Sequence, residues 1–310
     1  MKVFVAGASG ALGRPLVRQL IAAGHAVTGM TRREERAEEI RAAGATAVVC
    51  DAFDAEALRV AVAAAAPEAV VHALTAIPER IDWKADPLAA TNRVRTEETR
   101  NLIDAAAAAG ARRIVAESVA FLYAPRGEWV KDEDADLFVG GPEPFGAAVD
   151  ALVDLERQVL KAEDMEGVVL RFGNFYGPGT AFAADGSQAD EARRGRLPIV
   201  GKGTGTFSFI HVEDAAAATV AALEGDVTGT FNVVDDEPAP MREWVPVYAE
   251  ALRAKRPRRV PAWLAGLLVG RGVARNAVEL RGASNAKAKR DLGWQPRYPS
   301  WRHGFREALG

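Results

Sequence analysis

The residues with the clearest chemical meaning form a glycine-rich run near the start of the chain. The run lies between an apolar, strand-like segment and a segment with helical spacing. Glycines here allow a tight turn, a close backbone approach to a pyrophosphate and close packing of helix on strand, and the helix start offers free N–H groups. The run therefore predicts nucleotide binding through Gly7, Ser9, Gly10, Ala11, Leu12 and Gly13.

The end of the second expected strand indicates which dinucleotide would bind. A site that prefers NAD places an acidic residue about 20 residues after the glycines. This sequence instead reads Met30-Thr31-Arg32-Arg33. Guanidinium groups suit a 2′-phosphate, so NADP is favoured over NAD, with Arg32 nearer the strand end than Arg33. The alternative is that the arginines start a solvated helix and pair with the acidic residues of 34–39.

Further cofactor contacts are expected after the third and fourth strands. Asp51 is placed to accept a hydrogen bond from the adenine amino group, with Ala52 beside it. Ala73, Leu74 and Thr75 follow the fourth strand, and we expect them to line the path of the cofactor.

These residues must be positioned by alternating strands and helices. Strands are expected at 2–7, 25–30, 46–50, 68–74, 112–118 and 167–172, and helices at 11–24, 33–44, 55–66, 91–110 and 146–163. Near-continuous apolar strands between helices predict an α/β fold with a doubly wound parallel sheet. We expect a dinucleotide-binding domain over 1–175. A smaller substrate lobe follows over 176–310, interleaved with segments of about 205–235 that return to the sheet domain.

Composition and charge exclude several classes of protein. The 310 residues are 49% hydrophobic and 26% charged, which excludes a disordered or fibrous chain. The net charge of −3 gives no global basic field for nucleic acid, and no apolar run reaches the ~18 residues that span a membrane. The four histidines are far apart in sequence, so no metal site is expected. The single cysteine, Cys50, cannot form an internal disulfide, which fits a cytoplasmic protein.

The positive charge is concentrated near the C-terminus. Residues 251–310 hold 14 Lys or Arg and 3 Asp or Glu, a net charge of +11, which leaves −14 on the first 250 residues. We interpret this region as a solvated basic face, and the alternative is a surface for an anionic ligand or partner.

Over nearly its whole length the chain resembles the extended short-chain dehydrogenase/reductase superfamily, in its NAD-dependent epimerase/dehydratase branch. The resemblance rests on GASGALG, CDAFD, VVHAL, RRIVAESVAFLYA, VVLRFGNFYGPG, FSFIHVEDAAAATVAAL and SNAKAKRDLGWQP. It implies a Rossmann-type sheet and a cleft between this sheet and a C-terminal substrate lobe. It also implies that Phe172 and Asn174 lie near the nicotinamide, and that residues around 174–211 help to wall the substrate pocket.

The catalytic machinery of the resembled family is missing. That family places a Tyr-x-x-x-Lys pair on the helix after the fifth strand and a Ser or Thr at the end of that strand. In this sequence Phe145 occupies the tyrosine position, Val149 the lysine position and Val119 the hydroxyl position. Phenylalanine cannot titrate and valine cannot form hydrogen bonds, so the usual proton transfer is not available.

Four other polar residues are candidates for the proton donor. Glu117 and Ser118 end the fifth strand, at the sheet edge where such folds place active sites, and a carboxyl there can act as an acid if its pKa is raised. Tyr176 and His211 are expected to reach the cleft. Each also has a structural interpretation: Tyr176 as a packing residue, His211 as the residue that orients a helix start, and Glu117 as a buried, hydrogen-bonded group.

Three classes of function follow. The first is an NAD(P)-dependent oxidoreductase acting on a small carbonyl, conjugated or sugar-like substrate, with a non-standard proton donor or a pre-activated acceptor. The second is a non-redox lyase, isomerase or cyclase with structural NADP. The third is an inactive dinucleotide-sensing or binding protein. Homodimers through two long helices are common in the resembled family, and residues 87–110 and 145–163 could form one here.

Overall fold

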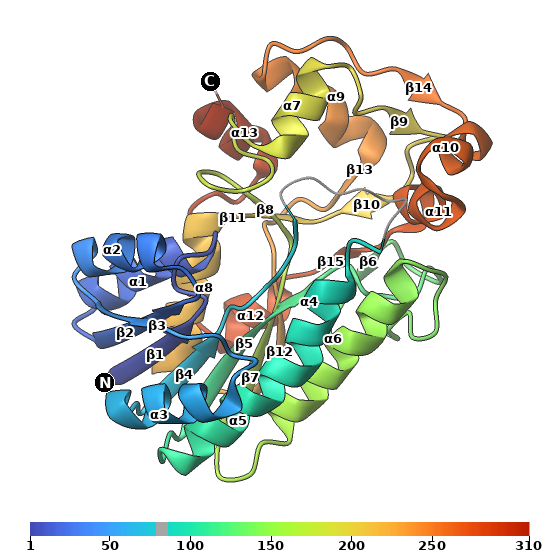
Figure 1. The fold of residues 1–310 in the computed structure, drawn as a ribbon. Coiled ribbons are helices and arrows are strands. Elements are labelled where there is room, and N and C mark those ends of the chain that lie inside the picture. The colour runs from blue at the N-terminus through green and yellow to red at the C-terminus, as the bar shows by residue number, and fades with distance from the viewer. Residues whose placement is uncertain (79–85, 310) are drawn as a thin grey trace.

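A seven-stranded parallel sheet forms the centre of the molecule. The computed structural model describes residues 1–78 and 86–309. The sheet order is β12-β7-β5-β4-β1-β2-β3 (Figure 1). The order reverses between β1 and β4, which is where doubly wound sheets bind ligands, so the predicted fold class is confirmed. The strands are β1 (Lys2–Ala6), β2 (Ala26–Thr31), β3 (Thr46–Val49), β4 (Ala69–His72), β5 (Arg113–Val119), β7 (Glu166–Phe172) and β12 (Gly229–Val233).

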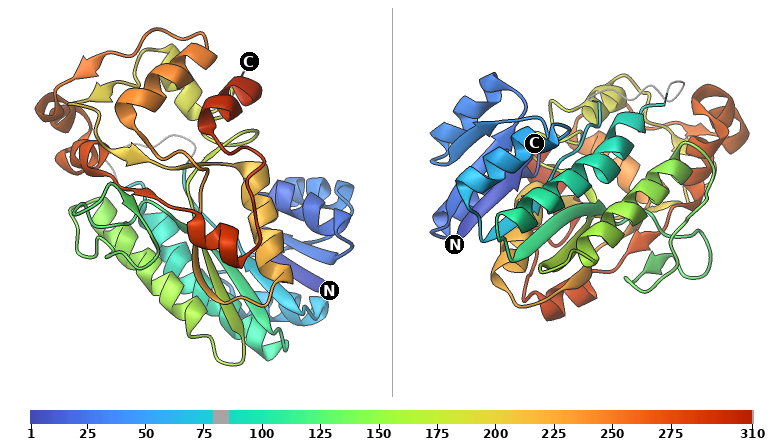
Figure 2. Two further views of the ribbon diagram at one scale, coloured as in Figure 1. Left: turned by 180° about the vertical axis from the view of Figure 1, so that it is seen from behind. Right: turned by 60° about the horizontal axis from the view of Figure 1, so that its bottom comes forward.

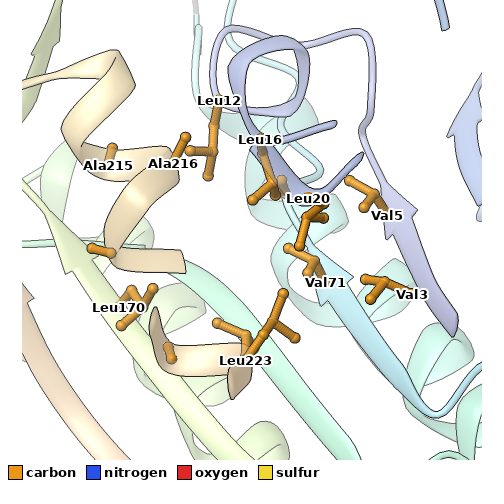
Figure 3. Close-up of a cluster of buried hydrophobic side chains, with 14 of the residues drawn as sticks. Val3, Val5, Leu12, Leu16, Leu20, Val71, Leu170, Ala215, Ala216 and Leu223 are labelled. Atoms are coloured by element: carbon orange, nitrogen blue, oxygen red, sulfur yellow. The ribbon is translucent and has the colours of Figure 1, made fainter. Parts of the chain in front are cut away.

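Helices cover both faces of the sheet because its strands are apolar on both sides. One face carries α1 (Gly13–Ala22), α2 (Glu34–Ala42) and α8 (Val212–Glu224). The other carries α3 (Ala55–Ala65), α5 (Thr99–Ala108) and α6 (Phe145–Leu160). Figure 3 shows the first face, where Leu16 and Leu20 of α1 and Leu223 of α8 pack over Val3 and Val71. On the second face α5 and α6 lie side by side, and the homodimer expected through this region stays a prediction.

The helix expected over 91–110 is divided into three parts. It consists of α4 (Ala89–Arg93), the π-helical turn η1 (Val94–Glu98) and α5. The hydroxyl of Thr99 donates to the carbonyl oxygen of Arg95 at 2.8 Å, and both Arg95 and Glu98 are buried. A π-helical turn inserts one extra residue and rotates the side chains that follow, and such turns are frequent at functional sites. Hydrophobic periodicity alone did not show this irregularity.

A smaller lobe lies beyond the sheet (Figure 1, top). Its core contains the aromatic rings of Phe182, Phe209, Trp244, Tyr248 and Phe305. Its helices are α7 (Ser187–Arg193), α9 (Met241–Ala251), α10 (Ala262–Val269), α11 (Arg271–Glu279) and α13 (Trp301–Leu309). Its short strands are β9 (Ile199–Val200), β10 (Thr206–Phe207), β13 (Ala239–Pro240) and β14 (Arg259–Val260), and β6 (Val130–Lys131) pairs with β15 (Gly282–Ala283).

The chain returns from the lobe to the sheet domain twice. The first return runs through β11 (Phe209–His211), which pairs with the outgoing strand β8 (Asn174–Tyr176), and continues into α8 and β12. The second is α12 (Ala286–Asp291), which lies over the same face of the sheet as α8 (Figure 2, left). The indole N–H of Trp294 donates to the carbonyl oxygen of Asp214 at 3.2 Å, so α12 is fastened to α8. Within the described residues, no helix combines the length and apolarity that crossing a membrane requires.

Candidate active site

The glycine-rich run forms a tightly packed turn where the sheet order reverses. Gly7 has a φ of +93°, and a Cβ there would lie 2.2 Å from the carbonyl oxygen of Ala73, which follows β4. A Cβ at Gly13 would lie 2.2 Å from the carbonyl oxygen of Gly7. Both positions therefore exclude any side chain, and the turn lies against the end of β4 at the reversal point, where doubly wound sheets form their ligand-binding crevice.

The turn and the first residues of α1 offer unused hydrogen-bond donors. Among the described residues, the backbone N–H groups of Ala11, Leu12 and Gly13 have no acceptor, and Leu12 cannot cap the helix with its side chain. Gly10 is exposed. The Ser9 hydroxyl lies 3.0 Å from that of Thr31, which ties the turn to the end of β2. Free N–H groups at the positive end of a ten-residue helix fit a pyrophosphate.

Two arginines follow β2, and their guanidinium groups have no ion-pair partner among the described residues. Arg32 and Arg33 are both exposed. The acidic residues of α2 pair elsewhere, Glu39 with Arg36 at 2.8 Å and Glu34 with Arg41 at 3.3 Å. Among the described residues neither Arg32 nor Arg33 pairs with these acidic residues, but Arg33 is the N-cap residue of the largely exposed helix α2, as the alternative expected.

The loop after β3 is held against the helix that follows β4. Asp51 is exposed, and one of its carboxylate oxygens accepts the backbone N–H of Phe53 at 3.1 Å. The carbonyl oxygen of Ala52 accepts a hydrogen bond from the side-chain amide of Asn101 at 2.9 Å. Beyond β4, Leu74 is half-buried and Thr75 is exposed. These residues stand at the carboxyl edge of the sheet, as expected for a cofactor path.

The positions predicted to correspond to the family's proton-transfer residues lie on or beside an apolar cluster. Phe145, Val149 and Leu152 follow one another along the face of α6 that packs toward β5. Val149 is 6% exposed and belongs to a cluster with Leu122, Leu152 and the partly buried Val119. No side chain of this cluster can donate or accept a proton.

Ser118 belongs to a buried network rather than to the crevice. Its hydroxyl donates to the Glu156 carboxylate at 2.7 Å, which also accepts two hydrogen bonds from the Arg171 guanidinium at 2.9 and 2.7 Å. Arg171 donates to the hydroxyl of Tyr123 at 3.1 Å, and that hydroxyl donates to Asn232 at 2.6 Å. These contacts fasten α6 to β5, β7 and β12, and a role as proton donor does not fit Ser118 here.

Tyr176 and His211 pack between the sheet and the lobe. Tyr176 is fully buried, its ring meets His211 and Phe305 edge-on, and its hydroxyl has no hydrogen-bond partner in the described part of the chain. Nδ1 of His211 accepts the backbone N–H of Glu213 at 3.2 Å and so caps α8. Burial lowers the pKa of His211 to about 4, which leaves it neutral near pH 7. These positions fit the structural interpretations of both residues.

Glu117 and the buried Arg95 are the charged residues at the end of the crevice where the reaction is expected. Glu117 is partly exposed, and burial raises its pKa to about 7 although the charge of Arg95 opposes that shift. Arg95 is 7% exposed, its Nη1 donates to Asn92 at 3.2 Å, and burial lowers its pKa to about 10. Sequence reasoning missed Arg95. The available signal was an arginine on the apolar side of the helical pattern at 91–110.

The two residues expected near the nicotinamide are fixed by packing. Phe172 is buried and its ring lies 5.3 Å from that of Phe175, centroid to centroid. Asn174 donates twice to the carbonyl oxygen of Ser208, from its backbone N–H at 2.8 Å and from its side chain at 3.1 Å. Both residues thus lie where β7 leaves the sheet and enters the lobe.

A doubly wound sheet with a glycine turn and free helix N–H groups at its reversal point defines a dinucleotide-binding α/β protein. The family model described as NAD dependent epimerase/dehydratase family matches residues 3–233, and the chain belongs to this family. The resemblance seen in the sequence is therefore confirmed.

Individual relatives cover almost the whole chain. A 3-diazoavenalumate denitrifying reductase from a Streptomyces species is 48% identical over 306 residues, which are 98% of this chain and 99% of that protein. Two solved structures share the fold with a TM-score of 0.78. They are the human epimerase family protein SDR39U1 with NADPH, at 22% identity and 100% and 99% coverage, and a Thermotoga maritima UDP-glucose 4-epimerase with UDP-glucose, at 20% identity and 100% and 97% coverage.

Proposed function

We propose that the protein is a nicotinamide-dinucleotide-dependent reductase whose substrate is a pre-activated electrophile, specifically an aryl diazonium acid. The observation that carries the proposal is the apolar cluster of Leu122, Val149 and Leu152, which contains the position predicted to hold the lysine of the resembled family's proton relay. Reduction of a ketone leaves an alkoxide that needs a proton. A diazonium carbon accepts hydride and releases dinitrogen, and no proton enters the balance.

The similarity to the Streptomyces denitrifying reductase supports this choice. Its name describes a reductive removal of nitrogen from a diazo-substituted carboxylate, and its sequence aligns with this chain over 306 residues. Among diazonium ions, aromatic ones live long enough in water to reach an enzyme. We therefore infer an aromatic substrate that carries both a diazonium cation and a carboxylate.

The residues of this chain hold the reactants and exclude water. Ala11, Leu12 and Gly13 would bind the pyrophosphate with their N–H groups, and a bound reduced nicotinamide supplies the hydride. The apolar surface of Val149 and its neighbours keeps water from the electrophilic carbon. Above about pH 7 the Glu117 carboxylate attracts the diazonium cation, while Arg95 attracts the carboxylate of the same substrate.

We further propose that NADP(H) is preferred to NAD(H) through Arg32. The support is that Arg32 lies beyond β2 without an ion-pair partner among the described residues. Replacement of Arg32 by Ala should weaken NADPH binding by roughly tenfold to a hundredfold and leave NADH binding nearly unchanged. Arg36→Ala, in the same helix, is the control. Equal affinity of the unmodified protein for both cofactors would contradict the assignment.

The proposed reaction can be tested with a matched pair of substrates. The protein and NADPH are incubated with 4-carboxybenzenediazonium or with 4-acetylbenzoate, beside a protein-free sample that measures spontaneous reduction. We expect protein-dependent formation of benzoate and dinitrogen from the first compound and slow or no reduction of the second. Rapid ketone reduction would contradict the proposal. Binding without turnover would favour a sensing protein, and turnover without net cofactor oxidation would favour a non-redox enzyme.

A further inference from the structure

Glu98 is a buried carboxyl group without a complete set of partners. It is the last residue of η1 and is 2% exposed. Its Oε1 atom has no hydrogen-bond partner within the described ranges. Burying a polar atom without a partner costs free energy, and such an atom in a native fold calls for a ligand or a function.

The surroundings of Glu98 place it at the adenosine end of the crevice. The helix that contains it packs on the loop after β3 at two points: the Asn101 amide donates to the carbonyl oxygen of Ala52, and the Arg93 guanidinium lies 4.6 Å from the ring centroid of Phe53. Glu98 stands between these two contacts in sequence, three residues before Asn101 and on the same side of the helix. The charges that act on its carboxyl include those of Arg32 and Asp51. The end of β2 and the loop after β3 therefore lie within electrostatic range of this carboxyl on η1.

We infer that Glu98 is a second acceptor for the 6-amino group of the cofactor's adenine, opposite Asp51. An exocyclic amine has two N–H donors, and two carboxyl groups on separate segments can take one each. The Asp51 carboxylate uses one oxygen for the backbone N–H of Phe53 and keeps acceptor capacity for a base. Hypoxanthine carries a carbonyl oxygen in place of the amine. This oxygen can only accept hydrogen bonds, so it would face the Asp51 and Glu98 carboxylates without any hydrogen to share. The site should therefore reject a 6-oxo base.

The protonation of Glu98 agrees with this assignment. Burial raises its pKa to about 7, with Arg32 lowering it and Asp51 raising it. Above that value the ionised carboxyl can only accept hydrogen bonds, whereas below it the neutral group carries an O–H that can donate to a 6-oxo base, so the discrimination should be greatest at pH 8 or above, where the affinities are to be compared. The inference requires a dinucleotide in the crevice and is independent of the proposed reduction, because a protein that binds but never reduces would show it equally.

Calorimetric titration with two cofactors tests the inference. NADPH and reduced nicotinamide hypoxanthine dinucleotide phosphate are titrated into the unmodified protein and into Glu98→Gln, Glu98→Met and Glu97→Gln. The unmodified protein should prefer the adenine form by roughly tenfold to a hundredfold. Glu98→Met should lose most of this preference by weakening NADPH binding. Glu97→Gln changes an exposed neighbour that pairs with Arg93, and it should leave the preference unchanged.

The isosteric Glu98→Gln variant makes the test independent of folding defects in Glu98→Met. Its amide can turn its N–H toward a carbonyl oxygen, so binding of the hypoxanthine form should improve and the preference should fall. An unchanged ratio of the two affinities in folded Glu98→Gln would overturn the assignment. So would equal binding of the two cofactors by the unmodified protein. Neither result bears on whether the protein reduces a diazonium substrate.

Discussion

The nucleotide end of the crevice depends on backbone groups, whereas the reacting end depends on side chains. At the nucleotide end, Gly7 and Gly13 matter because they have no side chain, and the binding groups are backbone N–H donors. At the reacting end, the family's machinery consists of side chains, and the positions predicted for it are Phe145 and Val149 on α6, with Val149 packed in an apolar cluster. A fold can thus keep its cofactor site and change its chemistry, because glycine turns tolerate no substitution while one helix face tolerates several.

The largest expected effect on dinucleotide affinity comes from adding a single methyl group at the nucleotide end. Gly7→Ala would place a Cβ 2.2 Å from the carbonyl oxygen of Ala73 at a φ of +93°, so the turn must move. We expect dinucleotide affinity to fall by about a hundredfold or more, together with a loss of stability. Gly24→Ala is the matched control, because its φ is +84° and nothing lies within 4 Å of the added Cβ. Equal cofactor affinities in the two variants, by fluorescence titration, would refute this.

The charge at the reacting end should appear as a pH dependence of stability. Burial raises the pKa of Glu117 to about 7 in the folded protein from 4.5, so the native state binds the proton more tightly than the unfolded chain. Glu117 therefore lowers the free energy of unfolding as the pH rises from about 4.5 to 7. Glu117→Gln should stabilise the protein by about 3 kcal/mol at pH 8 and have little effect at pH 4. Urea unfolding at both values measures this, with the exposed Glu128→Gln as control. A pH-independent effect of Glu117→Gln would argue against the assignment.

Tyr123 and Tyr176 differ in whether their buried hydroxyl groups form hydrogen bonds within the described residues. The Tyr123 hydroxyl contacts Asn232 and Arg171, so Tyr123→Phe should cost about 1–3 kcal/mol of unfolding free energy. The Tyr176 hydroxyl is buried without a partner in the described residues, so Tyr176→Phe should be neutral or slightly stabilising. Denaturant unfolding of the two variants gives the comparison. A cost at Tyr176 equal to that at Tyr123 would reveal a contact that the structure does not show.

The smallest expected effect concerns Ser118. Its hydroxyl makes one hydrogen bond to Glu156, which keeps both bonds from Arg171 when the hydroxyl is removed. Ser118→Ala should therefore cost about 1 kcal/mol of stability and leave the turnover rate within roughly twofold. A large loss of rate with unchanged stability would return Ser118 to the list of proton donors.

Sequence periodicity predicted six of the seven strands of the sheet and most of its helices, whereas β12 and α8 were expected only as part of the returning segments of about 205–235. The strands at 112–118 and 167–172 lie within one residue of β5 and β7, and the helix at 146–163 begins one residue after the start of α6 and ends three residues beyond it. Apolar runs buried on both faces leave little freedom in where a parallel strand falls. The π-helical turn η1 was not predicted. One extra residue shifts the helical period only locally, and hydrophobic periodicity averages over such a shift.

The candidate site was predictable to the extent that it depends on glycines and on absent side chains. The apolar identity of Phe145 and Val149 is visible in the sequence alone. By contrast, nothing in the sequence separates Ser118, held by Glu156 from a distant helix, from Glu117 one residue earlier. Neighbouring residues of a strand point to opposite faces, and only the packed structure shows which face belongs to the crevice. Arg95 and Glu98 required the structure for the same reason.

The most direct test of the central claim follows the hydrogen that replaces dinitrogen. The protein is given NADPH deuterated at the transferable position of nicotinamide C4 and an aryl diazonium acid in ordinary water, and the reciprocal sample uses unlabelled NADPH in deuterium oxide. Hydride transfer without a protein proton donor predicts deuterium on the product carbon in the first sample and none in the second. Deuterium on that carbon from the solvent, or transfer of the cofactor label to a simple ketone at a comparable rate, would contradict it.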